Sequence, residues 1–424
     1  MDLLPDDVVA NILGRLPPCS IAGCRGVRRE WRATIDGRRL LRADLLPLRL
    51  DGFFCRATLL DSQTYFFAPP SAAQGIDPRL DFLGEEGRDY ANIVDLCNGL
   101  LLLWDRVVNP ATRQWIPLTP FPRPCAGMEG FFYRLILAYD PLGLMPPPPH
   151  CSVVRFPIVP IYNDIDFTDD SEWPPSTFTI HIFSSAQRVW QERSFVRQGA
   201  PTGTIADMRH ENDGCHRRAV FFRGALYVHC QNNSVIRIAL SDNKYQMITS
   251  PATAENQVFH HGHVCLGKSD KGVYSAFLSK EDEWPWCRVW LLDESCQWVL
   301  KSNISLRWLA QNFPFDNTDK YSRPWINNST KHVHQARVVQ DESEWDFDSG
   351  ITLSDEISDS TDVLTYGTVL LGFHPYKEIA FFHISNSRVV SYHLNTSRVQ
   401  ELGVLIEQPI AESFPYTRCM LDVP

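Results

Sequence analysis

Apolar residues near the start of the chain recur at helical spacing. One face of a helix is indicated by positions separated by one, three or four residues: Val8, Val9, Ile12, Leu13 and Leu16. Pro5 suits the first helical position, and the pair Asp6-Asp7 lies where a helix N-terminus favours negative charge. Pro17-Pro18 then ends the predicted helix, because proline lacks an N–H donor and restricts the residue before it.

Shorter apolar repeats predict more helix up to residue 46. Ser20 can cap a second helix that carries Ile21 and Cys24. A third helix is indicated by apolar residues at every fourth position: Val27, Trp31 and Ile35. A domain of about 45 residues rarely buries enough apolar surface to be stable alone. The apolar face therefore either docks a partner protein or caps the domain that follows, and the pattern alone favours neither.

After residue 46 the pattern changes to short apolar strands separated by polar turns, and it stays so to the C-terminus. An all-β region of about 375 residues is too long for one ordinary sandwich, and radial repetition of small sheets is the usual solution. The predicted fold class is therefore α+β multidomain, with a small helical domain at 1–46 and an all-β propeller at 50–424.

A polar turn that leads into an aromatic or branched residue recurs along the predicted strands. Its clearest copy runs from Asn109 to Trp115, where Asn109 can bond its own backbone and Pro110 fixes φ. The closing residues are 50, 75, 55, 53 and 101 positions apart: Tyr65, Trp115, Trp190, Tyr245, Trp298 and Val399. A unit of about 50 residues fits if the gap of 75 holds an insertion and the gap of 101 an uncounted unit. This predicts about seven blades of four strands, with the closing aromatic rings at the sheet interfaces.

Two intervals interrupt the repeat and are predicted to be loop insertions, near 145–175 and near 341–362. The first contains consecutive prolines from Pro146 to Pro149 and an acidic run from Asn163 to Glu172. The second is strongly acidic and carries no Lys or Arg. Such a block repels itself, so a solvated, mobile loop is favoured over a docking tail for a basic partner.

Charge and cysteine usage narrow the class and the compartment. Hydrophobic residues make up 44% and charged residues 21%, which indicates a globular chain, and the formal net charge of −10 argues against general nucleic-acid binding. No apolar stretch of about 18 residues predicts a membrane span, and no signal-peptide pattern follows Met1. The twelve cysteines are scattered without a Cys-x-x-Cys pair, which is typical of reduced thiols. These features predict a cytoplasmic or nuclear protein without nucleic-acid or membrane partners.

No motif for catalysis or cofactor binding stands out. Glycine-rich phosphate-binding loops and the Gly-x-Ser-x-Gly pattern are absent from the sequence. His260-His261-Gly262-His263 and His332-Val333-His334 have spacings that suit a metal, but no cysteine or carboxylate set accompanies them at a recognisable interval. The sequence therefore predicts no catalytic residue, no metal, no cofactor and no enzymatic activity.

The first forty or so residues resemble the F-box of plant F-box proteins. The resemblance rests on Leu4-Pro5-Asp6-Asp7, Ile12-Leu13, Arg15-Leu16-Pro17, Ser20-Ile21, Val27 and Arg29-Glu30-Trp31-Arg32. It implies a helix cluster that binds the Skp-type adaptor of a cullin-based ubiquitin ligase. The implied contact or core residues are Leu4, Pro5, Val9, Ile12, Leu13, Leu16, Pro17, Ile21, Val27 and Trp31. The second helix departs from the family at Gly23 and Gly26, which stand where better helix-forming residues are usual. Each glycine inside a helix lowers its stability by roughly 0.5–1 kcal/mol relative to alanine.

The strand region resembles the F-box-associated propeller of the same plant family. The best-matching stretches are Cys97-Asn98-Gly99-Leu100-Leu101, Asn109 to Trp115, Leu137 to Pro141, Phe222 to Tyr227 and Leu371-Gly372-Phe373. The resemblance implies a ligase subunit that docks to the adaptor and holds a target protein for ubiquitination and degradation, while other subunits perform the chemistry. The alternative is a propeller enzyme, or a module that binds glycan or protein, with an incidental helical cap.

A candidate target surface lies at residues 280–286, between the apolar strands Val273–Leu278 and Val289–Leu292. This polar run contains Trp284 and Trp286 on either side of a proline, and exposed tryptophans are normally avoided unless they contact something. The other interpretation is that Trp286 begins the next strand and packs there, which leaves only Trp284 exposed.

Overall fold

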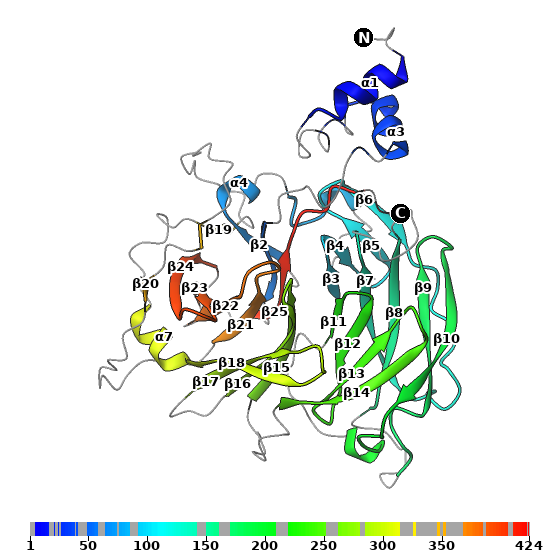
Figure 1. The fold of residues 1–424 in the computed structure, drawn as a ribbon, viewed down its shortest axis with the longest axis vertical. Helices are drawn as coiled ribbons and strands as arrows, with labels where there is room; N and C mark the ends of the chain where they lie inside the picture. Colours follow the sequence, from blue (N-terminus) through cyan, green and yellow to red (C-terminus); the bar gives the residue numbers. More distant parts are fainter. Residues whose placement is uncertain are drawn as a thin grey trace.

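The computed structural model describes two N-terminal helices followed by a region built almost entirely of strands (Figure 1). The described residues are 5–16, 21, 24, 27–38, 40, 49–57, 64–73, 76–84, 92–141, 150–160, 170–208, 219–251, 262–279, 285–313, 325–327, 346–347, 351–352, 368–384, 387–405, 410–421 and 423. No helix within these ranges is long and apolar enough to cross a membrane. No disulfide joins the cysteines within them.

The two N-terminal helices, α1 (Asp6–Leu13) and α3 (Arg29–Gly37), pack against each other. Their shared core holds Leu13, Ile21 and Ile35, which are 3%, 3% and 0% exposed. Half-buried apolar side chains complete this core: Val9, Leu16, Cys24, Trp31 and Leu40. The helical spacing seen in the sequence is therefore confirmed for α1 and α3.

The strands form antiparallel units of four, each named here after its innermost strand. The β3 unit holds β3 (Asp95–Cys97), β4 (Leu100–Leu102), β5 (Arg106–Asn109) and β6 (Gln114–Pro117), and the β7 unit holds β7 (Phe132–Tyr139), β8 (Cys151–Ile158), β9 (Thr177–Ser184) and β10 (Val189–Gln198). The β11 unit holds β11 (Ala219–Phe222), β12 (Ala225–His229), β13 (Ser234–Ala239) and β14 (Lys244–Thr249), and the β15 unit holds β15 (Gly262–Ser269), β16 (Gly272–Ser279), β17 (Trp286–Leu292) and β18 (Trp298–Ser305). The β21 unit holds β21 (Val369–Phe373), β22 (Ile379–Ile384), β23 (Arg388–His393) and β24 (Arg398–Val404), with β20 (Ile351–Thr352) added outside β24. The β25 unit holds β25 (Ile410–Tyr416), β1 (Gly52–Ala57), β2 (Thr64–Ala68) and β19 (Ile326–Asn327).

The six innermost strands contact one another in a closed ring, and the sheets lie around a common centre (Figure 1). The order is β25, β3, β7, β11, β15, β21 and back to β25. Parallel pairing of β10 with β14, at Val196–Gln198 and Lys244–Gln246, joins the β7 and β11 units into one sheet of eight strands. An all-β region after a small N-terminal part is confirmed.

The described residues hold six such units, one fewer than the sequence predicts. The interval of 101 residues between Trp298 and Val399 was expected to contain an uncounted unit. Its extra length instead supplies α7 (Leu306–Asn312), which follows β18 directly, and the short strands β19 and β20. These strands extend existing sheets, so length alone was a poor guide to the number of units.

The repeated polar turn is confirmed by its backbone conformation. In every described copy the residue two positions before the closing residue has a positive φ of 54–60°: Arg113, Arg188, Asn243, Cys296 and Ser397. Residues other than glycine rarely adopt this conformation, so a shared left-handed position marks the same hairpin in each unit. This hairpin joins the two outer strands of each of these five units.

Two predicted loop insertions contain regular or buried parts. The interval 145–175 includes β8, a full strand of the β7 unit, because its alternating apolar residues follow directly after the proline run. The interval 341–362 includes β20 and Phe347, whose side chain is only 1% exposed. Neither interval is therefore a continuous loop in the part that the structure describes.

Closure of the ring depends on a core between the β25 and β21 units. This core is formed mainly by Phe53, Phe67, Leu371, Phe381 and Leu402, and residues from the long interval fill it: Trp325 and Phe347. The Trp325 ring centroid lies 5.4 Å from that of Phe67 and 6.2 Å from that of Phe53. Its backbone N–H donates to the Leu402 carbonyl at 3.0 Å, which ties the two sheets together.

A matched pair of tryptophan substitutions tests this core. We expect Trp325→Ala to lower the free energy of unfolding by roughly 3–5 kcal/mol, because the side chain is 1% exposed and fills the core between the two units. Trp115 was expected at a sheet interface, but it is 43% exposed and carries only Arg106 over its ring. Trp115→Ala is therefore expected to cost about 1 kcal/mol or less. Chemical denaturation followed by circular dichroism measures both, and equal losses would contradict the assignment.

His374 makes the core between the β25 and β21 units sensitive to pH. Its side chain is fully buried, with its ring centroid 5.2 Å from that of Phe347, and Nδ1 accepts from the Tyr376 and Lys377 N–H groups at 3.1 Å each. Burial, and then the positive charge of Lys377, lower the pKa of His374 from 6.5 to about 3. Between about pH 3 and pH 6.5 the His374 imidazole is therefore neutral in the folded protein, whereas the same side chain binds a proton in the unfolded chain.

We expect the free energy of unfolding to fall as the pH drops from 6.5 towards 3, because protonation of His374 then favours the unfolded chain. His374→Asn keeps a side-chain acceptor for the two N–H groups but cannot titrate, so the fall with pH should become shallower. Urea denaturation at several pH values measures the slope, with His150→Asn as the control outside this core. An unchanged slope in His374→Asn would refute the role of this histidine.

Candidate functional site

Helix α1 carries two apolar stripes, and only one of them faces the helical core. Val9, Leu13 and Leu16 belong to the core. Pro5, Val8 and Ile12 are three and four positions apart, so they share a second side of the helix. Val8 is 41% and Ile12 48% exposed, and Pro5 is exposed as well. The second stripe therefore faces solvent over the whole length of α1.

The adaptor-contact residues predicted from the sequence separate into three groups. Pro5, Ile12 and Val27 are exposed, and Val27 is the most exposed of the three at 61%. Core positions are taken by five others: Val9, Leu13, Leu16, Ile21 and Trp31. Leu4 and Pro17 lie outside the described residues. Val8 is an addition, since the sequence showed it as apolar but could not show which side of the helix is covered.

Charged side chains of the two N-terminal helices, which together form the helical head, pair with one another and leave the stripe apolar. Asp7 in the first turn of α1 forms an ion pair with Arg38, which directly follows α3. Arg15 Nε donates to Asn11 Oδ1 at 3.0 Å across one turn, beyond the end of the stripe. Exposed pairs of this kind contribute little to stability. An exposed apolar stripe beside charged residues is the chemistry of a docking surface for a protein.

A central pocket lies where the six innermost strands meet. Lys268 on β15 points to the turn after β3 and to β11, because its Nζ donates to Asn98 Oδ1 at 3.0 Å and to the Phe221 carbonyl at 2.8 Å. Asn98 Nδ2 in turn donates to the Tyr139 carbonyl at 2.7 Å. One chain of hydrogen bonds therefore links four units of the ring at the pocket wall.

The carboxylate in this pocket also serves the strands around it. Asp95 Oδ2 accepts from the Leu137 N–H at 2.8 Å, and Oδ1 accepts from the Leu96 N–H at 2.8 Å. These hydrogen bonds hold β3 and β7 together at the wall of the central pocket.

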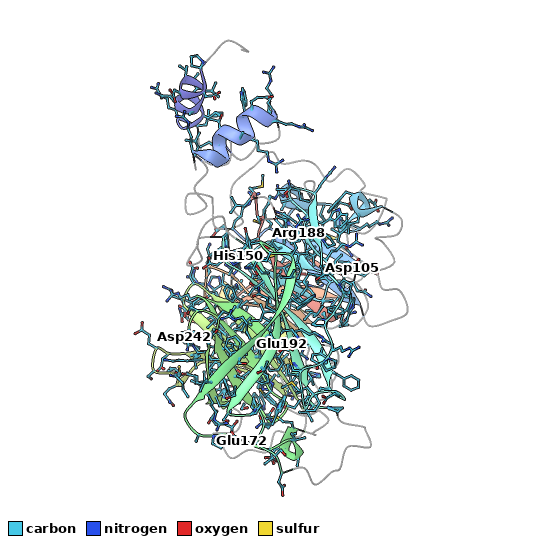
Figure 2. All side chains as sticks on the ribbon, turned by 90° about the vertical axis from the view of Figure 1, so that its right-hand side faces the viewer. Asp105, His150, Glu172, Arg188, Glu192 and Asp242 are labelled. Atoms are coloured by element: carbon cyan, nitrogen blue, oxygen red, sulfur yellow. The ribbon has the colours of Figure 1, made fainter. Side chains whose placement is uncertain are left out.

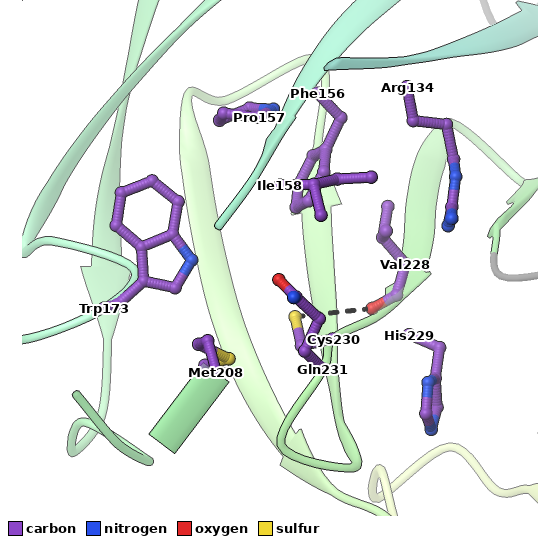
Figure 3. Close-up of a pocket in the computed structure, with 10 residues that line it drawn as sticks. All are labelled: Arg134, Phe156, Pro157, Ile158, Trp173, Met208, Val228, His229, Cys230 and Gln231. Carbon is purple, nitrogen blue, oxygen red and sulfur yellow. Dashed lines mark hydrogen bonds between the residues drawn. The ribbon is translucent and has the colours of Figure 1, made fainter. Parts of the chain in front are cut away.

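A second, small pocket lies between the β7 and β11 units (Figure 3). Figure 3 shows Trp173 and Met208 on one side and Arg134 and His229 on the other. Gln231 is held rigidly, because its amide donates to the Val159 carbonyl at 2.9 Å and accepts from the Val159 N–H at 3.1 Å.

Trp286 begins β17 and packs on its own sheet. Its ring centroid lies 5.4 Å from that of Phe277, and the Arg288 guanidinium lies 4.5 Å from the ring. The ring is half-buried, so only part of it is available for contact. Trp284 lies outside the described residues.

Three possible metal ligands come together beside the β7 unit: Cys125, His181 and Glu192. Cys125 Sγ lies 3.4 Å from His181 Nδ1, and His181 Nε2 lies 3.4 Å from Glu192 Oε1. Burial raises the pKa of the Cys125 thiol and lowers the pKa of His181. These directions are opposite to those of a thiolate–imidazolium pair, so the cluster is not arranged as an activated nucleophile.

The histidine motifs that the sequence singled out do not form this cluster. His263 is half-buried on β15, and the other histidines of the two motifs lie outside the described residues. His181 and Glu192 lie opposite each other in the hairpin of β9 and β10, which the polar turn between them indicates. Cys125 comes from a distant connection, and no local signal could have predicted that it meets this pair.

Comparison with known proteins gives one family match and similar plant proteins. Residues 1–43 match the F-box domain. An F-box protein of Arabidopsis thaliana is 30% identical over 143 residues, which are 29% of this chain and 35% of that protein. An F-box/LRR-repeat/kelch-repeat protein of the same plant is 22% identical over 267 residues, which are 59% of this chain and 65% of that protein. The chain therefore spans less than two thirds of each relative.

Proposed function

We propose that this protein is the target-recognition subunit of a Skp–cullin–F-box ubiquitin ligase in the cytoplasm or nucleus. The observation that carries the proposal is the exposed stripe of Pro5, Val8 and Ile12 on a helical head that matches the F-box domain. A helical unit this small gains stability if a partner covers such a stripe. The Skp-type adaptor is that partner, and it connects the chain to the cullin scaffold.

The proposed organisation has two domains. Residues 1–46 form the F-box domain, and residues 50–424 form a propeller of six blades, with loop insertions in the parts of 145–175 and 341–362 that lie outside β8 and β20. The closed ring of innermost strands supports a propeller, because radial repetition leaves only short sheet edges. One of the relatives is named for kelch repeats, which form propeller blades, and this name is consistent with the same architecture.

The proposed subunit acts by proximity and performs no chemistry itself. A target held on the propeller stays near the activated ubiquitin carried by the other subunits, which raises the effective concentration of its lysines. This role needs two separate binding surfaces and no nucleophile. The polar groups of the central pocket, which are bonded to neighbouring strands, fit such a role better than they fit an enzyme.

A substitution on the exposed stripe tests adaptor docking. Ile12→Asp places a charge where the adaptor would bury an apolar side chain, and we expect roughly tenfold weaker capture or more. Ile12 is 48% exposed, so α1 should still fold, unlike after a change at the buried Leu13. Co-expression of the full chain with a Skp-type adaptor, followed by pull-down and titration, measures the loss.

The matched control is Asn11→Asp, which adds the same charge to the neighbouring exposed position of α1. The new carboxylate can still accept the hydrogen bond from Arg15, so capture should be kept. Full capture by Ile12→Asp would refute docking through this stripe. Equal loss in both variants would assign the effect to charge on the helix rather than to the apolar contact.

For the target we propose contact through the loop that holds Trp284 and Trp286. Trp286 is half-buried against Phe277 and offers only part of its ring, so Trp284 would supply most of the contact. Tryptophan is enriched among residues that carry binding energy, and Pro285 restricts the backbone between the two tryptophans.

Two alanine substitutions separate target contact from structure. Trp284→Ala should leave the melting temperature unchanged and lower the recovery of proteins cross-linked to the full chain when the proteasome is blocked. Trp286→Ala should lower the melting temperature, because it removes packing on Phe277. Recovery of the same proteins with Trp284→Ala would place the target surface elsewhere on the protein.

A further inference from the structure

We propose that Cys125, His181 and Glu192 form a binding site for one Zn²⁺ ion at the outer side of the β7 unit. The three side chains come from three segments: the connection between β6 and β7, strand β9 and strand β10. Their ligand atoms all lie within 4.8 Å of one another. This site is independent of the adaptor and target surfaces proposed above.

Strand register preorganises two of the ligands. His181 lies directly opposite Glu192 in the antiparallel pair of β9 and β10, so both side chains stand on the same face of the sheet. His181 Nε2 lies 3.4 Å from Glu192 Oε1 in consequence. The pair needs no backbone movement to face a common ion.

The connection between β6 and β7 supplies the third ligand. Trp190 Nε1 on β10 donates to the Thr119 carbonyl at 3.0 Å, and the Phe121 ring centroid lies 5.6 Å from that of Trp190. A turn closed by the Met128 N–H on the Cys125 carbonyl, at 3.0 Å, then directs Cys125 Sγ towards His181. The connection is therefore fixed on both sides of the cysteine.

The spacing of the three atoms fits tetrahedral zinc. Zn–S, Zn–N and Zn–O bonds of about 2.3, 2.0 and 2.0 Å place neighbouring ligand atoms about 3.3–3.6 Å apart. The observed separations are 3.4 Å from Nε2 to Oε1 and 4.0 Å from Sγ to Nε2. Rotation of the Cys125 side chain is needed to bring Sγ closer to Nε2 and to the Glu192 carboxylate, since the three ligand atoms are otherwise only within 4.8 Å of one another.

The donor set selects the ion. Thiolate, imidazole and carboxylate together suit Zn²⁺, whereas Mg²⁺ and Ca²⁺ require oxygen ligands throughout. Within the described residues no fourth His, Cys, Asp or Glu atom joins the group, so water takes the remaining position. The Glu192 side chain is 65% exposed and gives the ion its entry path (Figure 2).

The nearest cation, Arg155, is occupied elsewhere. It lies opposite His181 on β8, but its guanidinium lies 3.7 Å from the Tyr133 ring centroid and donates to the Pro122 carbonyl at 2.8 Å. With Cys125 as a thiolate and Glu192 as a carboxylate, the occupied site carries no net charge. Binding of Zn²⁺ releases the thiol proton to solvent, so the single negative charge of the empty site is removed beside Arg155.

Metal titration of the full-length, tag-free protein tests the site. With Zn²⁺, wild type should bind one more equivalent than Cys125→Ser, and saturating Zn²⁺ should raise the melting temperature of wild type alone. With Co²⁺ as the spectroscopic probe, wild type should show thiolate-to-metal charge transfer and strong ligand-field bands, which Cys125→Ser should lack. Cys151→Ser, a buried cysteine of the same unit, is the matched control and should behave as wild type.

A variant at an exposed ligand keeps the test decisive if substitution of the buried Cys125 impairs folding. Glu192→Gln changes an exposed side chain and should weaken Zn²⁺ binding roughly tenfold or more, with an unchanged melting temperature in the absence of metal. Equal Zn²⁺ stoichiometry in wild type and Cys125→Ser, a Co²⁺ complex without thiolate absorption, or an unchanged affinity in Glu192→Gln would each overturn the proposal.

Discussion

The pairing of β25 with β1 is the interaction on which the rest of the structure depends, because it joins the two ends of the strand region. The register runs from Gly52 opposite Tyr416 to Arg56 opposite Glu412, and these last two side chains form an ion pair at 2.7 Å. Ser413 Oγ donates to the Leu371 carbonyl at 2.7 Å and so connects the closing sheet to the β21 unit. No unit of four strands buries both of its faces alone, so every sheet relies on this closure.

The segment after β25 explains why two sequence motifs have the residues that they do. Asn109 Nδ2 donates to the carbonyls of Cys419 and Leu421 at 2.9 and 2.8 Å, while its Oδ1 accepts from the Ala111 N–H inside the polar turn. Gly99 has a φ of +88°, and a Cβ there would lie 2.5 Å from the Thr417 carbonyl oxygen. Both motifs therefore hold the C-terminal segment across the β3 unit, and a larger residue at Gly99 would push it away.

The local sequence pattern predicted well which helices and hairpins form. It predicted poorly how many sheet units they make and which side chains come into contact. Spacing of three and four residues identified α1 and α3, and the polar turn identified the outer hairpins, because both depend on neighbouring residues. Within the described residues, the interval that holds Trp325 and Phe347 adds strands to existing sheets and does not show the further unit expected from its length. Spacing also showed that α1 is apolar, but which stripe faces Leu13 and Ile35 follows only from the packing of the helices.

The distribution of polar groups separates what holds the ring from what is free to bind. The hydrogen bonds of Lys268, Asn98 and Asp95 join neighbouring innermost strands. A ligand that replaced these hydrogen bonds would leave buried carbonyl and N–H groups unpaired. Recognition by this protein is therefore expected at its outer connections and at the α1 stripe, where exposed groups can gain a partner without loss to the fold. In this arrangement the centre can stay constant while the outer connections change, which suits a scaffold whose proposed task is to hold a target and leave the chemistry to others.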